Sequence, residues 1–334
     1  MKIKLLIATT DSDYAEHLSS FISEKFKDTF DVSVCSSAGR LKEILTTSKF
    51  DMALLEPNIT HVNNLNLIQL PLALIDESED FLESSTSMKK IRKYQRISSI
   101  VGTILEYYSE VGKSVNSFIK NRAHITAVWS PAGGTGKTTV ALACAANKVS
   151  SNRKTVYLNL ENFSSTSAYF QENGKSISKV FEKLESNAEI FLMGIRQMDS
   201  GSGISYFCGP ENYDDISILT ANDIEALVNA CVVEIDELVI DLSSQCDDKV
   251  QRIFELADTV LAVCDTSSTA QAKLRQFLTQ HNVFGLIHDK TILVNNKGAK
   301  TGGTQVSRAI QLPLVQSADP ISVYKTLSVG NFDW

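Results

Sequence analysis

The residues best suited to chemistry form a glycine-rich segment that ends in lysine and threonine. The segment reads Ser130-Pro131-Ala132-Gly133-Gly134-Thr135-Gly136-Lys137-Thr138-Thr139. Its glycines allow the backbone to curl so that successive N–H groups face one phosphate. The lysine can then reach the β- and γ-phosphates, and the first threonine hydroxyl can ligate Mg²⁺. The spacing therefore predicts a nucleotide-phosphate site.

The flanks of this segment support the same interpretation. An apolar run over 125–129 precedes it, and an alanine-rich helix is predicted over 140–149. A strand, a glycine-rich turn and a helix N-terminus are the context that a phosphate loop needs. An ordinary glycine-rich turn is the alternative. The strict pattern has Gly six residues before the lysine, where this chain has Pro131, so the loop is a variant.

Polar residues also end three other predicted strands. Asp241, near the end of 238–242, can hold a Mg²⁺-bound water, and a capping aspartate is the alternative. Glu161 could align an attacking water as a base, or it could be a solvated loop residue. Asn295 and Asn296 end a strand in the manner of a simple turn or of a base-contacting segment.

The absence of one aspartate indicates which nucleotide base the site would bind. GTPases read guanine with Asn-Lys-x-Asp, in which the aspartate accepts hydrogen bonds from the base. Here Asn296-Lys297-Gly298-Ala299 has alanine at the place of the aspartate. Adenine needs no such acceptor, so we expect ATP.

The elements that must position these residues alternate between strand and helix patterns. This alternation predicts an α/β chain with parallel sheets. In the first part we expect strands over 5–8, 32–34, 52–55 and 70–75, and helices over 14–26, 41–45 and 97–108. In the second part we expect strands over 125–129, 155–160, 216–219, 238–242, 259–264 and 291–295. A capping box at Thr220 and Asp223 begins a further helix. We place the domain boundary near residue 115, giving domains 1–115 and 116–334.

Composition narrows the classes of function. The chain has 334 residues, 43% of them hydrophobic, with 32 basic and 39 acidic side chains and a net charge of −7. This acidic balance disfavours a generic nucleic-acid binder. The six cysteines form no Cys-x-x-Cys pair, which argues against a zinc site or a disulfide scaffold. There is no signal-peptide pattern and no run of eighteen apolar residues, so we expect a cytoplasmic protein.

The glycine-rich loop resembles the deviant phosphate loop of the ParA/MinD family of dimeric ATPases, and the resemblance covers about 124–334. It implies a doubly wound P-loop NTPase domain, an ATP and Mg²⁺ site over 132–139, and a homodimer. Asn159-Leu160-Glu161 matches the family's Asp-x-Asp, and Asp241 matches its Walker B aspartate. Asn295 and Asn296 match its adenine-contacting step, and Pro313 the proline segment that follows.

This sequence departs from that family at one functional position. The family's signature lysine, which crosses the dimer interface to the partner's phosphates, is Ala132 here. A cation aimed at the transition state of phosphoryl transfer raises the rate by about 10³–10⁵ in the case of arginine fingers. Its loss, together with Glu161 in place of aspartate, predicts ATP binding with slow hydrolysis or none.

The first domain resembles a response-regulator receiver, a flavodoxin-like parallel sheet. Its paired metal-binding acids are replaced by Thr9 and Thr10, and Glu56 stands where the phosphorylated aspartate would be. Lys93 matches the receiver's lysine. We therefore expect a pseudo-receiver that binds proteins and cannot form an acyl phosphate. The basic run 89–96 is interpreted as a solvated face, or as a contact for an acidic partner or anionic lipid.

A receiver-like domain in front of a deviant ParA/MinD-like ATPase is the arrangement of the TadZ/CpaE family. The resemblance implies a localisation switch in polar assembly of a tight-adherence (Flp/Tad) pilus secretion apparatus. Its partners would be other apparatus proteins or a polar landmark. Two alternatives stay open, a ParA-like partitioning ATPase that binds DNA nonspecifically and a P-loop phosphotransferase. The tail 321–334 has one lysine and no helical apolar stripe beyond Val323 and Leu327, which argues against insertion into a membrane.

Overall fold

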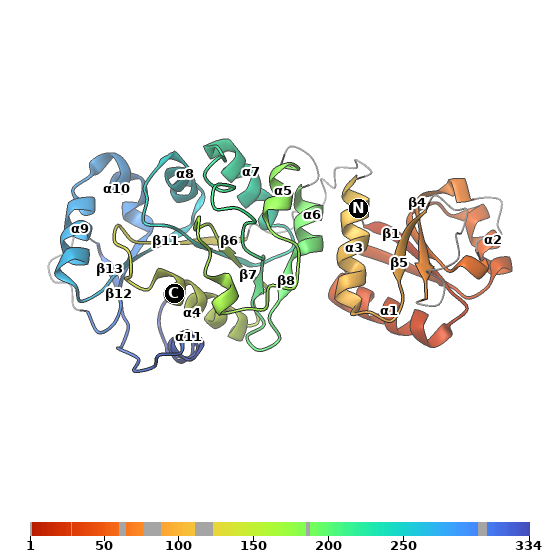
Figure 1. Ribbon diagram of the computed structural model, residues 1–334, viewed down its shortest axis with the longest axis horizontal. Helices are drawn as coiled ribbons and strands as arrows, with labels where there is room; N and C mark the ends of the chain where they lie inside the picture. Colours follow the sequence, from red (N-terminus) through yellow and green to blue (C-terminus); the bar gives the residue numbers. More distant parts are fainter. Residues whose placement is uncertain are drawn as a thin grey trace. The chain divides into compact units, whose positions relative to one another are not determined.

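The chain folds into two compact units, Met1–Phe118 and Ile119–Trp334. The computed structural model describes residues 2–27, 29–59, 65–76, 88–110, 123–184, 188–299 and 306–334. The boundary predicted near residue 115 lies outside these ranges. Each unit contains one sheet with helices packed on it, so the α/β class is confirmed (Figure 1).

Unit 1 is built on five parallel strands in the order β2-β1-β3-β4-β5. The strands are β1 (Ile3–Ala8), β2 (Phe30–Cys35), β3 (Phe50–Leu55), β4 (Ile68–Ile75) and β5 (Lys89–Arg92). The helices are α1 (Ser12–Lys25), α2 (Ala38–Thr47) and α3 (Ile97–Glu110), with 3-10 turns at Pro57–Ile59 and Leu65–Leu67. The chain reverses its direction of winding between β1 and β3. Ligand sites of doubly wound sheets lie at this point, beyond the carboxyl ends of the strands.

The helices of unit 1 begin at residues that cap them. Asp11 accepts a hydrogen bond from the backbone of Tyr14 at the start of α1, and Ser37 caps α2 in the same way. Leu41 and Leu45 of α2 are buried in a cluster with apolar side chains of β1 and β3. Helix α1 contacts α3. The caps and the apolar helix faces together explain why these short segments are helical.

Unit 2 is built on eight strands in the order β13-β12-β11-β6-β10-β7-β9-β8, all parallel except the β8–β9 pair. The strands are β6 (His124–Trp129), β7 (Thr155–Asn159), β8 (Gln197–Met198), β9 (Ser205–Tyr206), β10 (Glu237–Asp241), β11 (Thr259–Cys264), β12 (Thr291–Asn295) and β13 (Arg308–Gln311). The helices are α4 (Lys137–Ser150), α5 (Ser178–Phe181), α6 (Ala188–Ile195), α7 (Ala221–Cys231), α8 (Asp248–Leu256), α9 (Ser268–Leu278), α10 (His281–Ile287) and α11 (Pro320–Ser328), with 3-10 turns at Thr166–Ala168 and His288–Lys290. Strand β6, which leads into the glycine-rich loop, is central.

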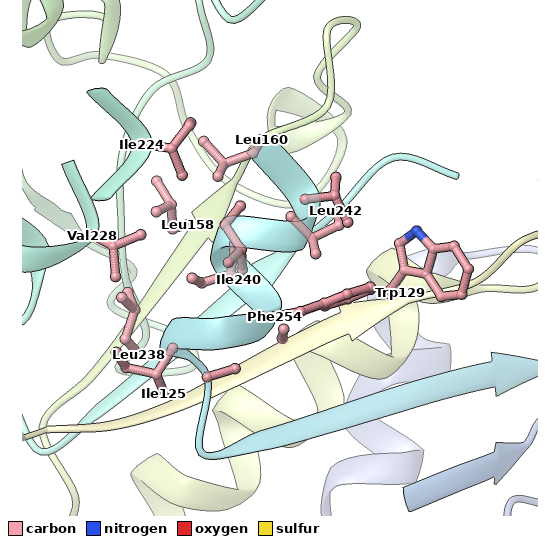
Figure 2. Packing of buried hydrophobic residues seen from close by; sticks show 14 of the residues in the cluster. Ile125, Trp129, Leu158, Leu160, Ile224, Val228, Leu238, Ile240, Leu242 and Phe254 are labelled. Carbon is pink, nitrogen blue, oxygen red and sulfur yellow. The ribbon is translucent and has the colours of Figure 1, made fainter. Parts of the chain in front are cut away.

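Alternation along the central strands sends neighbouring side chains to opposite faces. Leu238 and Ile240 of β10 join the core under α7 and α8, where Trp129 meets Phe254 edge to face at 5.6 Å (Figure 2). Val239 joins the core on the α4 side. Asp241 has the same parity as Val239, so its carboxylate is directed to the face that carries α4.

The structure corrects one predicted strand. Residues 216–219 form turns, in which Ile216 and Leu219 are buried and Ile218 is 73% exposed. Two buried residues three apart follow the spacing of a helical turn, so the apolar run was wrongly read as a strand. The capping box at Thr220 and Asp223, predicted to begin a helix, is confirmed at the start of α7. Strands β5, β8, β9 and β13 were not predicted.

The final helix packs on the helix that follows the glycine-rich loop. Tyr324 and Leu327 of α11 are buried in the core on the α4 side, and Asn147 of α4 donates to the Ser328 carbonyl at 3.0 Å. The apolar residues of α11 therefore face the fold. Among the described residues, no helix combines the length and the apolar character needed to cross a bilayer.

Candidate nucleotide-binding site

The glycine-rich loop follows central strand β6 and leads directly into α4. Its conformation depends on glycine at two positions, since Gly134 has φ 75° and Gly136 has φ 91°. Gly136 is also the N-cap of α4, and a Cβ there would collide with the Asn296 amide. The first N–H groups of α4 therefore stand open at the carboxyl edge of the sheet, where a helix N-terminus favours anions.

Lys137 is the first residue of α4, and its side chain is 8% exposed. Its Nζ lies 3.1 Å from Ser244 Oγ and 3.9 Å from Glu161 Oε1. These two partners come from the loops that follow β10 and β7. The ammonium group is thus held where three loops meet, and phosphate oxygens could replace both partners.

Asp241, at the end of β10, is completely buried. Its Oδ2 accepts hydrogen bonds from the Tyr157 hydroxyl at 2.9 Å and the Asn159 amide at 3.2 Å. Burial, and secondly the charge of Glu161, raises the pKa of Asp241 to about 7, although the nearby Thr138 hydroxyl favours the charged form. The carboxylate therefore lies close to the hydroxyl of Thr138, the residue that follows Lys137.

The other oxygen of Asp241 tests whether Mg²⁺ fits here. Asp241 Oδ1 is buried and has no hydrogen-bond partner among the described residues. An orphaned carboxylate oxygen beside a threonine hydroxyl is the donor set of a hard cation. Thr138 and Asp241 are thus the residues that would hold Mg²⁺, directly or through a water.

Glu161 lies at the rim of the same site. Burial raises the pKa of its carboxyl, while the Lys137 ammonium acts in the opposite direction. Its backbone N–H donates to Asn159 Oδ1 at 3.0 Å, which ties the rim to the residues around Asp241. A carboxylate with a raised pKa next to Lys137 is able to orient a water, the role predicted for it.

The remaining predicted residues divide into two groups. Asn296 donates from Nδ2 to the Thr135 carbonyl at 2.9 Å, so its side chain contacts the phosphate loop itself. Pro313 lines a surface hollow together with Gly298, Ala299, Gln311 and Leu312. Asn295 is buried at the end of β12 and receives the backbone N–H of Leu312 on its carbonyl. The hollow stands at the edge of the site where we predicted the adenine contacts.

Ala132 is buried, with 5% of its surface exposed, and belongs to the core under α7 and α8. Its N–H donates to Ser130 Oγ at 3.2 Å. The position at which the sequence resemblance led us to compare a lysine is therefore filled by a small apolar side chain within the unit. Thr135 and Thr139 complete the loop and the first turn of α4, and Gly133 takes no strained conformation.

Unit 1 has a polar cluster at the carboxyl edge of its own sheet. Glu56 Oε2 accepts from the Thr10 N–H at 2.7 Å, the Thr10 hydroxyl at 2.8 Å and the Thr9 hydroxyl at 3.1 Å. Lys93, directly after β5, donates to Glu56 Oε1 and to the Thr9 hydroxyl. Burial opposes ionisation of Glu56, but these hydrogen bonds outweigh it and lower its pKa to about 2.

Lys93 stands apart from the basic run around it. Its side chain is 5% exposed, whereas Lys90 and Arg96 lie on the surface. The position of Lys93 beside Glu56 was expected only from the resemblance of the first domain to response-regulator receivers. The run 89–96 is thus divided between a buried ion pair and exposed charges.

No protein-family model matches the chain, and no curated protein matches it. Its structure is similar to that of a ParA family ATPase from Chlorobium tepidum TLS, with a TM-score of 0.52 and 16% identity over 63% of this chain and 94% of that chain. Two further structures have a TM-score of 0.45. They are the cell division ATPase MinD of Pyrococcus furiosus, with 12% identity over 62% of this chain and 97% of that chain, and cobyrinic acid a,c-diamide synthase of Mycobacterium smegmatis with bound ATP analogue and magnesium, with 14% identity over 61% and 93%. The first likeness shows that this chain contains the fold of a ParA-family ATPase.

Proposed function

We propose that unit 2 binds ATP with Mg²⁺ and acts as an ATP-dependent, homodimeric switch with weak or absent hydrolysis. The observation that carries the proposal is the arrangement of three groups around one helix N-terminus. Lys137 faces two replaceable partners, Thr138 follows it, and Asp241 offers a buried oxygen without a partner. A phosphate chain with its metal satisfies all three groups at once.

Weak turnover follows from the residues around the γ-phosphate position. Among the described residues, Lys137 is the cation that we place there, because Ala132 is a buried apolar residue. Glu161 can orient a water, but burial raises the pKa of its carboxyl and so opposes the ionised form that acts as a base. We therefore expect the protein to bind ATP but to hydrolyse it slowly or not at all. A turnover of ATP at tens per second by the purified protein would contradict this part of the proposal.

The wider role is proposed from the order of the two units. In unit 1 the Glu56 carboxylate is held by an ion pair and hydrogen bonds, and unit 1 precedes the unit for which we propose ATP binding. This order fits a protein-binding module joined to an ATP-dependent switch. We propose that the chain acts in the cytoplasm, peripherally at the cell pole, in assembly of a tight-adherence pilus secretion apparatus. The test is whether a fluorescent fusion gathers at the pole, and whether Lys137→Ala releases it while Lys290→Met does not.

The decisive experiment on the purified chain combines titration with sizing. We expect saturable ATP binding that requires Mg²⁺ and a change from monomer to dimer when ATP is added. Lys137→Ala should abolish both effects. Lys290→Met is the matched control. Lys290 lies just before β12, at the opposite edge of the sheet, and donates to the carbonyls of Glu255 and Ala257 at the end of α8. If Lys137→Ala binds ATP as the wild type does, the proposed site is wrong.

Two other outcomes would redirect the proposal. A salt-sensitive shift of random-sequence DNA on adding ATP would favour a partitioning ATPase. Transfer of the γ-phosphate to an added small-molecule acceptor would favour a phosphotransferase. The net charge of −7 argues against the first outcome.

A further inference from the structure

The loop that follows β12 contacts the phosphate loop at two successive backbone carbonyls. Asn296 Nδ2 donates to Thr135 O at 2.9 Å, and Lys297 Nζ donates to Gly134 O at 2.6 Å. The partners are 161 and 163 residues apart in the sequence, so these are tertiary contacts. Lys297 itself is held by Asp265, whose Oδ2 lies 3.1 Å from Nζ.

We infer that Lys297 is a positioning residue that keeps the phosphate loop ready to bind, an inference that rests on the proposed nucleotide site. In a trans peptide the C=O of one residue and the N–H of the next point in opposite directions, and no described peptide bond is cis. Drawing the carbonyls of Gly134 and Thr135 toward the β12 loop therefore aims the N–H groups of Thr135 and Gly136 away from it. Successive N–H groups that share one direction form an anion-binding nest.

The contact also depends on two special backbone conformations. Lys297 has φ 55°, which turns the chain after β12. Gly136 leaves room for the Asn296 amide, because any Cβ at 136 would collide with it. Both loops are therefore shaped to the contact, and a loop that is already in its binding conformation loses less entropy when phosphate arrives.

Asp265 orients the Lys297 side chain that contacts the glycine-rich loop. It accepts from the N–H and hydroxyl of Ser267, at 3.0 and 2.8 Å, as well as from Lys297. Burial opposes its ionisation, but these hydrogen bonds lower the pKa of Asp265 below its ordinary value. The carboxylate thus fixes the direction of the Lys297 ammonium, which is the role of a partner in a charge-assisted hydrogen bond.

The test uses the full chain and three probes, ATP–Mg²⁺, tripolyphosphate–Mg²⁺ and adenosine. We expect Lys297→Met to weaken binding of ATP and of tripolyphosphate by the same factor, about tenfold or more. Adenosine should bind the variant and the wild type equally. Lys297→Arg should recover most of the affinity because it keeps a donor and a charge. An effect of Lys297→Met on adenosine but not on tripolyphosphate would mean a base contact and would overturn the inference.

Asp265→Asn separates positioning from simple charge. Asparagine can still accept from Ser267, but it loses the ionic contact with Lys297. If Lys297 acts by position, Asp265→Asn weakens tripolyphosphate binding as Lys297→Met does. If it acts by its charge at a distance, removal of the nearby carboxylate strengthens binding, and the inference fails.

The control variant keeps this test distinct from that of the proposed function. Lys290→Met removes a lysine with similar carbonyl contacts at the other edge of the sheet and should bind all probes normally. Should Lys137→Ala abolish ATP binding while Lys297→Met behaves like Lys290→Met, the nucleotide site stands and the positioning role is wrong. If Lys297→Met does not fold, the comparison of Lys297→Arg and Asp265→Asn with the wild type decides the matter.

Discussion

Lys93 and Glu56 form an ion pair across the carboxyl edge of the sheet in unit 1. Their side chains are 5% and 12% exposed, and they come from the ends of different strands. The hydroxyls of Thr9 and Thr10 add hydrogen bonds to the same carboxylate. The ion pair is therefore buried and fully hydrogen-bonded, the condition under which such pairs persist. Because Lys93, Thr9 and Thr10 all contact the Glu56 carboxylate, we propose a structural role for it.

Lys93→Met is expected to destabilise unit 1. It leaves the Glu56 carboxylate buried without its cation, and breaking one partner of a buried pair costs about 3–5 kcal/mol. Hydrogen exchange of peptides from β1 and β3 in the full chain would measure the loss. Addition of Glu56→Gln should restore part of it, and Lys90→Met, on the surface of β5, should have no effect. Equal protection in the Lys90 and Lys93 variants would refute the prediction.

The pair also makes the stability of unit 1 depend on pH. The pKa of Glu56 is lowered from 4.5 to about 2 in the folded chain. The stabilisation is therefore complete above about pH 4.5 and is lost as the pH falls toward 2, and it is on the order of 3 kcal/mol. Wild type and Glu56→Gln should differ most near pH 6 and about half as much near pH 3. A difference that stays constant over this range would show that ionisation of Glu56 is not responsible.

Gly136→Ala should disrupt the phosphate loop. Alanine at φ 91° is strained, and its Cβ would displace the Asn296 amide from the Thr135 carbonyl. We expect a loss of ATP affinity of about a hundredfold or more. Gly285→Ala is the matched control, since a Cβ at that helical position meets no atom within 4 Å. Normal ATP binding by Gly136→Ala would mean that the loop does not need this conformation.

Asp241→Asn should separate nucleotide binding from metal binding. Asparagine keeps an oxygen for the Tyr157 hydroxyl but removes the negative charge that a divalent cation needs. Titrations of ATP with and without Mg²⁺ should show that the metal raises affinity in the wild type and not in the variant. Asp319→Asn, at the cap of α11, serves as control. Retention of the full metal effect in Asp241→Asn would exclude Asp241 from the Mg²⁺ site.

Sequence patterns predicted most of the central strands and the phosphate loop, for a local reason. Buried parallel strands are continuous apolar runs, and the loop requires glycines, a lysine and a threonine next to one another. Strands β8 and β9, at one end of the sheet, have two residues each, too few for any period to be visible. The strand predicted over 216–219 was wrong because an apolar run alone does not distinguish a strand from a buried turn.

The partners of the site residues could not be predicted in the same way. Asn295 and Asn296 were interpreted as a base-contacting step, which stays a prediction. That pattern did not predict that the side chains of Asn296 and Lys297 contact the carbonyls of Thr135 and Gly134. The signal that was present is the lysine between an asparagine and a glycine after a strand. What it contacts depends on the neighbouring strand order, which no local pattern contains. Lys93 and Glu56 meet for the same reason.

The Trp129 indole donates from Nε1 to the carbonyl of Gln245 at 2.8 Å, in the loop that follows Asp241. The chain has two tryptophans, and the other is Trp334 at the C-terminal end. The chain thus carries an intrinsic chromophore hydrogen-bonded to the loop whose Ser244 contacts Lys137. In a Trp334→Phe background, a change in Trp129 emission on addition of ATP–Mg²⁺ would therefore test the proposed nucleotide site without any attached dye.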